Sequence, residues 1–149
     1  MTDWGDITDA IGLALGGEKQ RGRDALAQCW AATADTDHAQ RCVMAHYLAD
    51  LQSTLEDEVA WDEAALSEHA HVVDADLAPV GMTSAEALAP SLHLNLGDGY
   101  LRQGRVDDAR TQVTAGLSAA SSLPDDGYGA HIRSGLERLQ ERVEQSASP

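Results

Sequence analysis

Apolar side chains recur every three or four positions along most of the chain, which is the repeat of one face of an α-helix. The clearest stripe lies near the C-terminus and consists of Tyr128, Ile132, Leu136, Leu139 and Val143. Charged side chains fill the other side of this segment, as expected for a helix with one buried face. The repeated pattern predicts helices over residues 4–15, 19–33, 37–52, 54–73, 90–103, 106–120 and 126–144.

Residues with capping or special backbone preferences mark where several of these helices begin and end. Asp37 with Gln40, and Ser53 with Glu56, have the spacing of a capping box, in which two side chains satisfy backbone N–H groups at a helix start. Gly104 follows an apolar stripe, where a glycine with positive φ ends many helices. These signals separate the predicted helices by short turns.

Consecutive helices joined by short turns pair into antiparallel hairpins. The sequence therefore predicts hairpins over residues 4–33, 37–73 and 90–120. Residues 74–89, which include Pro79 and Gly81, form an insertion before the third hairpin, and helix 126–144 closes the array. We predict a single all-α domain over residues 1–149, built as a short right-handed stack of three hairpins with a C-terminal capping helix.

Composition agrees with a helical, folded domain. Hydrophobic residues make up 43% of the chain, alanine and leucine dominate, and phenylalanine is absent, which favours helices over strands. No apolar run approaches the roughly 20 residues of a membrane span, and the N-terminus is acidic, unlike a secretory signal. We therefore expect a cytoplasmic protein without membrane contact, in which Cys29 and Cys42 are reduced thiols.

Acidic residues dominate the middle of the chain. Between Cys42 and Leu101 there are eleven Asp and Glu residues, four of the six histidines and no Lys or Arg. Together with a net charge of −15, this composition argues against binding to nucleic acid. Two interpretations stay open, a solvated acidic face and a docking surface for a basic partner segment. The candidate residues of such a docking surface are Glu58, Trp61, Asp62 and Glu63.

Signals for chemistry in the same stretch are weak. His69 and His71 are two residues apart, so their side chains would point about 200° apart on a helix and would not easily share a metal ion. The chain has no nucleophile elbow and no phosphate-binding glycine loop. We predict a protein that is not an enzyme and has no cofactor or metal site. Two alternatives stay open, a small-ligand or metal-responsive sensor using residues 42–101 and a self-associating structural subunit.

The third predicted hairpin carries a recognisable motif. Its residues are His93-x2-Leu96-Gly97-x2-Tyr100, then Gly104, then Ala109-x3-Val113. This spacing resembles the tetratricopeptide repeat, in which a small residue allows two helices to approach and an aromatic residue fills the space between them. The sequence departs from the repeat where His93 replaces a tryptophan and Val113 replaces a phenylalanine.

The resemblance implies a superhelical scaffold whose first helices line a groove for a protein or peptide. On that pattern the groove residues would be Tyr47, Asp50, Asn95, Asp98 and Arg102. The basic residues of the carboxylate-binding subtype are missing from residues 42–101, so we expect a partner that is basic or apolar rather than acidic. A homodimer formed through the groove or through an end of the stack stays open.

Overall fold

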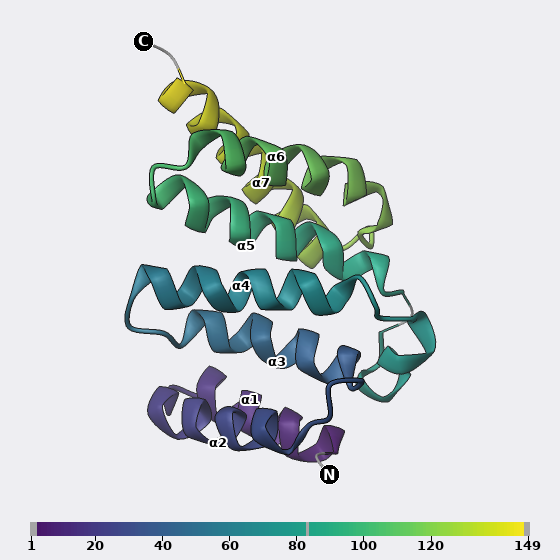
Figure 1. The fold of residues 1–149 in the computed structure, drawn as a ribbon. Helices are drawn as coiled ribbons and strands as arrows, with labels where there is room; N and C mark the ends of the chain where they lie inside the picture. Colours follow the sequence, from purple (N-terminus) through teal and green to yellow (C-terminus); the bar gives the residue numbers. More distant parts are fainter. Residues whose placement is uncertain (1–2, 83, 148–149) are drawn as a thin grey trace. The chain divides into compact units, whose positions relative to one another are not determined.

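The computed structural model describes residues 3–82 and 84–147, and these residues contain helices and no strand. The α-helices, labelled in Figure 1, are α1 (Trp4–Leu15), α2 (Lys19–Ala32), α3 (His38–Asp50), α4 (Leu55–His69), α5 (Ala89–Arg102), α6 (Val106–Ala119) and α7 (Gly127–Ala147). Short 3-10 helices cover η1 (Asp74–Val80), η2 (Glu86–Leu88) and η3 (Ala120–Ser122). The all-α prediction is confirmed, and each predicted helix is present, α1 with the predicted bounds and the others with one or both ends shifted.

The largest shift lies at the end of α4. This helix stops at His69 rather than at residue 73, because the chain turns at Ala70 and is extended at Val73. The β-branched pair Val72 and Val73 has low helix propensity. The next helical turns belong to η1, which buries Leu77 completely. The predicted insertion is therefore folded and contributes to the core.

Two helix starts differ in detail from the predicted capping boxes. Asp37 precedes α3 but does not cap it, because its carboxylate accepts a hydrogen bond from the Ala34 N–H at 2.8 Å and closes the preceding turn. Thr54, not Ser53, caps α4, and its hydroxyl accepts a hydrogen bond from the Asp57 N–H at 3.2 Å. The capping residue at α4 was thus predicted one position too early.

The chain divides into two compact units, residues 1–83 and 84–149. In the first unit α1 pairs with α2 and α3 pairs with α4, while α3 also packs against both α1 and α2. The centre of this packing is a cluster of fully buried side chains from three helices. Its members are Ile7, Ala10, Leu26, Met44 and Leu48.

Helices α1 and α2 meet at Gly22 with almost no space between their backbones. A Cβ atom placed at Gly22 would lie 2.7 Å from the backbone nitrogen of Ala14 and 2.8 Å from its Cβ. A real Cβ atom essentially never comes this close to a non-bonded heavy atom, so any larger residue would force the helices apart. The turn that joins the two helices uses Gly17 with φ of 95°, a conformation that favours glycine.

The second unit consists of the hairpin α5–α6 with α7 packed against both of its helices. Its motif residues take the predicted places. A Cβ atom at Gly97 would lie 3.0 Å from Leu139 of α7 and 3.3 Å from Gln112 of α6, so glycine allows the close packing. Gly104 has φ of 79° after the end of α5, as predicted. Tyr100 is 7% exposed and lies beneath the Arg105 guanidinium at 4.1 Å.

Helix α7 completes the core of this unit with the predicted apolar stripe, of which Ile132, Leu136, Leu139 and Val143 are buried. Tyr128, the first member of the stripe, is instead 47% exposed. Across the described residues, no helix combines the length and the apolar character that a membrane span requires.

The contact at Gly22 gives a matched pair of stability predictions. We expect Gly22→Ala to destabilise the protein by about 1–3 kcal/mol, since the new methyl group meets backbone atoms of α1 that cannot move aside. Gly12→Ala, in the same hairpin, meets nothing within 4 Å and should stabilise it by roughly 0.5–1 kcal/mol through helix propensity. Urea denaturation of both variants measures the difference, and equal effects would contradict the packing at Gly22.

Candidate partner-binding surface

Arg41 connects three helices of the first unit. From α3, its Nε atom donates a hydrogen bond to Glu68 of α4 at 3.1 Å, and its Nη1 atom donates to the Thr33 hydroxyl at 3.1 Å. Its guanidinium also lies 4.0 Å from the ring centroid of Trp30 on α2. The Arg41 and Glu68 side chains are each 18% exposed, so this ion pair is largely shielded from water.

Two histidines extend the cluster on the side of Glu68. The Nδ1 atom of His38 lies 2.7 Å from the second carboxylate oxygen of Glu68, and the rings of His38 and His71 lie 4.7 Å apart. Because an ionised carboxylate can only accept hydrogen bonds, Nδ1 of His38 carries the hydrogen. We call Trp30, Thr33, His38, Arg41, Glu68 and His71 the Arg41 cluster.

The electrostatics of the cluster favour an ionised Glu68. Partial burial opposes ionisation, but hydrogen bonds from His38 and Arg41, together with their charges, outweigh burial and lower the pKa of the Glu68 carboxyl below its ordinary value. Glu68 is therefore a fixed negative charge that Arg41 neutralises within the fold.

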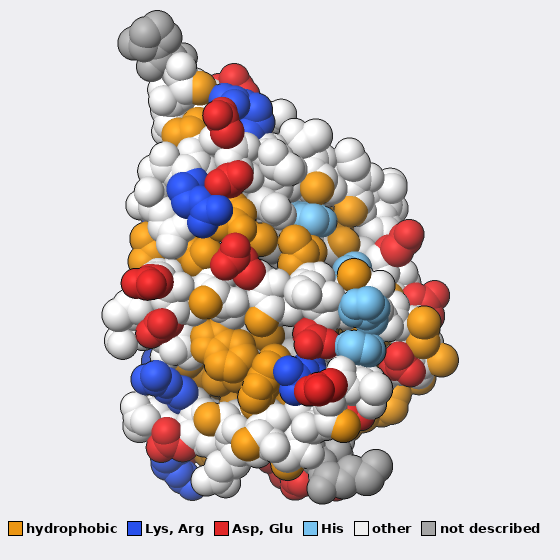
Figure 2. Space-filling model, in the orientation of Figure 1, with side chains coloured by type: hydrophobic (Ala, Val, Ile, Leu, Met, Phe, Trp, Pro, Cys, Tyr) orange, Lys and Arg blue, Asp and Glu red, His pale blue; other side chains and the backbone are white. Residues whose placement is uncertain are grey.

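A pair of tryptophans lies beside the Arg41 cluster. The rings of Trp30 and Trp61 meet edge to face, with centroids 4.9 Å apart, and both side chains are half-buried against the core of the unit. Figure 2 shows hydrophobic side chains gathered over α3 and α4 with histidine, basic and acidic side chains next to them. The surface thus offers an aromatic patch that stays partly accessible.

The structure separates the residues predicted as an acidic docking surface. Trp61 packs on the core, Glu63 is exposed, and Glu58 is half-buried. The prediction is wrong for Asp62, whose side chain is only 4% exposed. Consecutive residues of a helix point about 100° apart, so Trp61, Asp62 and Glu63 do not share one face. Proximity in sequence was a poor guide to this surface.

Two of the predicted groove residues belong to the first unit. Tyr47 packs partly buried against the core, and Asp50 ends α3. The pKa of the Asp50 carboxyl is raised by partial burial and by the Glu58 carboxylate, against the opposing effects of His46 and Lys19. Asp50 and Glu58, predicted as parts of different sites, are therefore electrostatic neighbours at the α3–α4 turn.

The other predicted groove residues, Asn95, Asp98 and Arg102, lie on α5 in the second unit. Asp98 accepts hydrogen bonds from Arg102 at 2.8 Å and from Arg142 of α7 at 2.8 Å. The pair with Arg142 ties α5 to α7, and the pair with Arg102 lies within α5, so Asp98 has a structural role. A groove formed jointly by residues of both units stays a prediction.

The cysteine and histidine residues were the candidates for redox or metal chemistry. Both cysteines are free thiols, and burial with a smaller contribution from Glu68 raises the pKa of Cys42 to about 12. His93, at the tryptophan position of the repeat motif, instead hydrogen-bonds Gln112 of α6 at 2.7 Å. Within residues 3–82 and 84–147, no group of three or more His, Cys, Asp and Glu side chains is arranged to hold a metal ion.

Known proteins give no indication of what this surface binds. No protein-family model, curated protein or solved structure matches the chain. The Arg41 cluster was not predicted from the sequence, although one signal pointed to it. Arg41 is the only Lys or Arg between Arg23 and Arg102, and an isolated basic residue among acids is a candidate for an internal ion pair.

Glu68→Gln tests the cluster through its pH dependence. We expect a loss of about 1–2 kcal/mol at pH 7, because Arg41 loses its partner in a partly buried site. The pKa of Glu68 is lower in the folded protein than its ordinary value of 4.5, so ionised Glu68 stabilises the fold at pH values above 4.5. This stabilisation is lost as the pH falls through the pKa of Glu68 in the folded protein. The difference from wild type should therefore shrink in acid, as measured by urea denaturation across pH.

The control is Glu63→Gln, which removes one exposed charge from the same helix. We expect this change to alter stability by less than about 0.5 kcal/mol at every pH. A Glu68→Gln effect of equal size at pH 7 and in acid would show that the ion pair is not its source.

Proposed function

We propose that the protein is a non-catalytic scaffold of the tetratricopeptide type that binds a basic protein or peptide. Helical hairpins joined by tight turns support this proposal, as do Gly97, Gly104 and Ala109, which take the positions expected from the motif in hairpin α5–α6. A right-handed superhelical arrangement of the hairpins is part of the proposal. So is a cytoplasmic location, which agrees with the two free thiols.

The charge distribution around Arg41 is the observation that carries the proposal. Residues 42–101 contain eleven acids and no Lys or Arg, and Arg41, the basic residue next to this stretch, is held by Glu68 and Trp30 inside the first unit. Exposed acids on α4 include Glu56, Asp57 and Glu63. A surface with this excess of negative charge attracts basic segments and accelerates their association.

The tryptophan pair adds apolar contact area to the proposed acidic docking surface. Trp61 belongs to the acidic helix α4, and Trp30 of α2 packs against it. Both side chains are half-buried, so each indole keeps an accessible part. Tryptophan is enriched at binding hot spots because it buries a large area with little loss of side-chain freedom. Arg41 stacks over Trp30 within the fold, and we propose that a partner's basic side chains make the same kind of contact with Trp61.

A salt-dependent binding assay tests this function. A lysine- and arginine-rich peptide is titrated into the protein while the tryptophan fluorescence is recorded, with a glutamine-substituted peptide as the reference. We expect saturable binding of the basic peptide alone, weakened roughly tenfold or more between low and high salt. Absence of binding at low salt would contradict the proposal.

Two charge-matched variants locate the surface. Asp57→Asn/Glu58→Gln removes two acids of α4 that lie within one helical turn of Trp61, whereas Glu137→Gln/Glu141→Gln removes two from α7. We expect the first pair to weaken peptide binding about threefold to tenfold and the second to change it by less than about twofold. Equal effects of both would mean that the peptide senses net charge only, with no docking surface on α4.

A further inference from the structure

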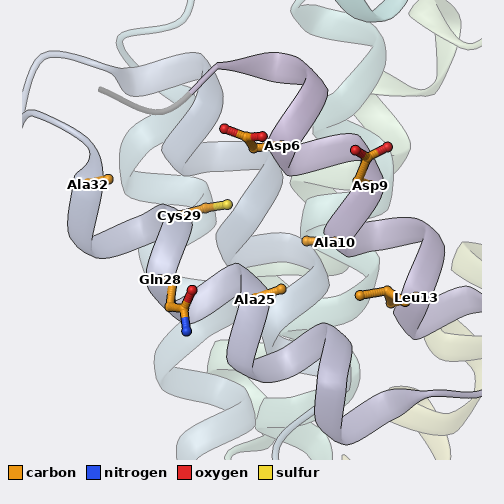
Figure 3. Close-up of a pocket in the computed structure, with 8 residues that line it drawn as sticks. All are labelled: Asp6, Asp9, Ala10, Leu13, Ala25, Gln28, Cys29 and Ala32. Carbon is orange, nitrogen blue, oxygen red and sulfur yellow. The ribbon is translucent and has the colours of Figure 1, made fainter.

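A groove runs between α1 and α2 on the surface of the first unit. It encloses about 370 Å³ and is drawn in Figure 3, which shows side chains of α1 along one side and of α2 along the other. Its lining residues from α1 are Asp6, Asp9, Ala10 and Leu13, and those from α2 are Ala25, Gln28, Cys29 and Ala32. We call it the α1–α2 groove.

The α1–α2 groove has a buried floor and an exposed rim, to which Asp6, Asp9, Gln28 and Ala32 contribute. On α1 the residues that pack in or on the core with α3 are Trp4, Ile7, Ala10 and Ile11, so Ala10 belongs both to the core and to the groove floor. Asp9 lies two residues from both Ile7 and Ile11, which on a helix is a rotation of about 200°. Asp9, on the exposed rim of the groove, therefore lies on a different face of α1 from Ile7 and Ile11, and the two faces adjoin at the buried Ala10.

In both units a third helix packs against the two helices of a hairpin. In the first unit α3 lies against both α1 and α2, and in the second unit α7 lies against both α5 and α6. In each case a helix packs against the two helices of a hairpin and covers their apolar side chains. The shape of the α1–α2 groove is thus suited to a further helix.

The lining residues specify the chemistry of that helix. The groove walls carry the small residues Ala10, Ala25 and Ala32, which leave room for large apolar side chains of an incoming helix. Asp6 and Asp9 lie on the α1 side of the groove, and Figure 3 shows them at its edge, across from the α2 residues Ala25 and Ala32. Carboxylates at the border of an apolar groove favour Lys or Arg on the occupant.

We propose that the α1–α2 groove binds an amphipathic helix of a partner protein, with apolar side chains between α1 and α2 and Lys or Arg side chains paired with Asp6 and Asp9. The inference rests on the proposed function for the basic character of the partner. It adds a second surface, distinct from α4, and a required conformation, since this groove selects a helix over an extended chain.

The test compares two fluorescent peptides of equal charge, one a helix-forming peptide with a leucine stripe flanked by lysines and the other an extended lysine-rich peptide without apolar residues. Fluorescence anisotropy gives both dissociation constants. Ala32→Trp fills the groove from an exposed position, and Ala31→Trp places the same side chain on the neighbouring exposed residue outside the groove. We expect Ala32→Trp to weaken helix binding about tenfold and Ala31→Trp to change it by less than about twofold.

A second pair of variants tests the charge. Asp9→Asn should weaken binding of the helix about threefold to tenfold, whereas Asp24→Asn, an exposed acid on α2 outside the groove, should leave it within about twofold. Cys29 gives a local readout, because a bound helix should slow its reaction with a thiol reagent in a Cys42→Ser background. Thermal denaturation confirms that each variant is folded.

The outcomes separate this inference from the proposed function. If Asp57→Asn/Glu58→Gln loses binding while Ala32→Trp and Asp9→Asn do not, the proposed helix site in the α1–α2 groove is overturned, whereas the proposed docking surface on α4 stands. Binding of the extended peptide without binding of the helical one would do the same. Sedimentation that shows a dimer, converted to a monomer by Ala32→Trp but not by Ala31→Trp, would assign the groove to a second copy of this chain and overturn the partner proposed here.

Discussion

The guanidinium of Arg41 lies between the indole ring of Trp30 and the carboxylate of Glu68, and through these contacts α3 is joined to α2 and to α4. An arginine suits this position because its planar group stacks on an aromatic face while its N–H groups point outward to acceptors. The pairing also has an electrostatic consequence. Arg41 is the only Lys or Arg between Arg23 and Arg102. Its charge is paired with Glu68, and the stretch contains no further Lys or Arg to pair with its other acids.

In the first unit the proposed docking surface adjoins the cluster that stabilises the fold. The Arg41 cluster connects α2, α3 and α4. Next to it, Trp30 of α2 and Trp61 of the acidic helix α4 are in contact and half-buried. The α1–α2 groove is a separate face, built from alanines and bordered by Asp6 and Asp9. Both surfaces suit a basic partner, but they differ in what they require of it, since one offers aromatic and charged contacts and the other the shape of a helix.

Periodicity predicted the helices well because each is set by local spacing and turn residues. Gly97 and Gly104 could likewise be placed from the motif, since close helix packing and a positive φ restrict the residue type. The failures arose where a side chain had a choice of partners. Asp37 bonds back to Ala34 rather than forward to α3, and Asp62 is buried although it lies in a run of acids. The Arg41 cluster joins residues far apart in sequence, which helical periodicity does not report.

The contribution of Arg41 is tested most directly by double-mutant cycles on the free energy of unfolding. One cycle combines Arg41→Gln with Glu68→Gln across α3 and α4, and the other combines Arg41→Gln with Trp30→Phe across α3 and α2. If Arg41 couples the three helices, the interaction energies should be about 1–2 kcal/mol with Glu68 and about 0.5–1 kcal/mol with Trp30. Additive effects in both cycles, within about 0.3 kcal/mol, would contradict this account.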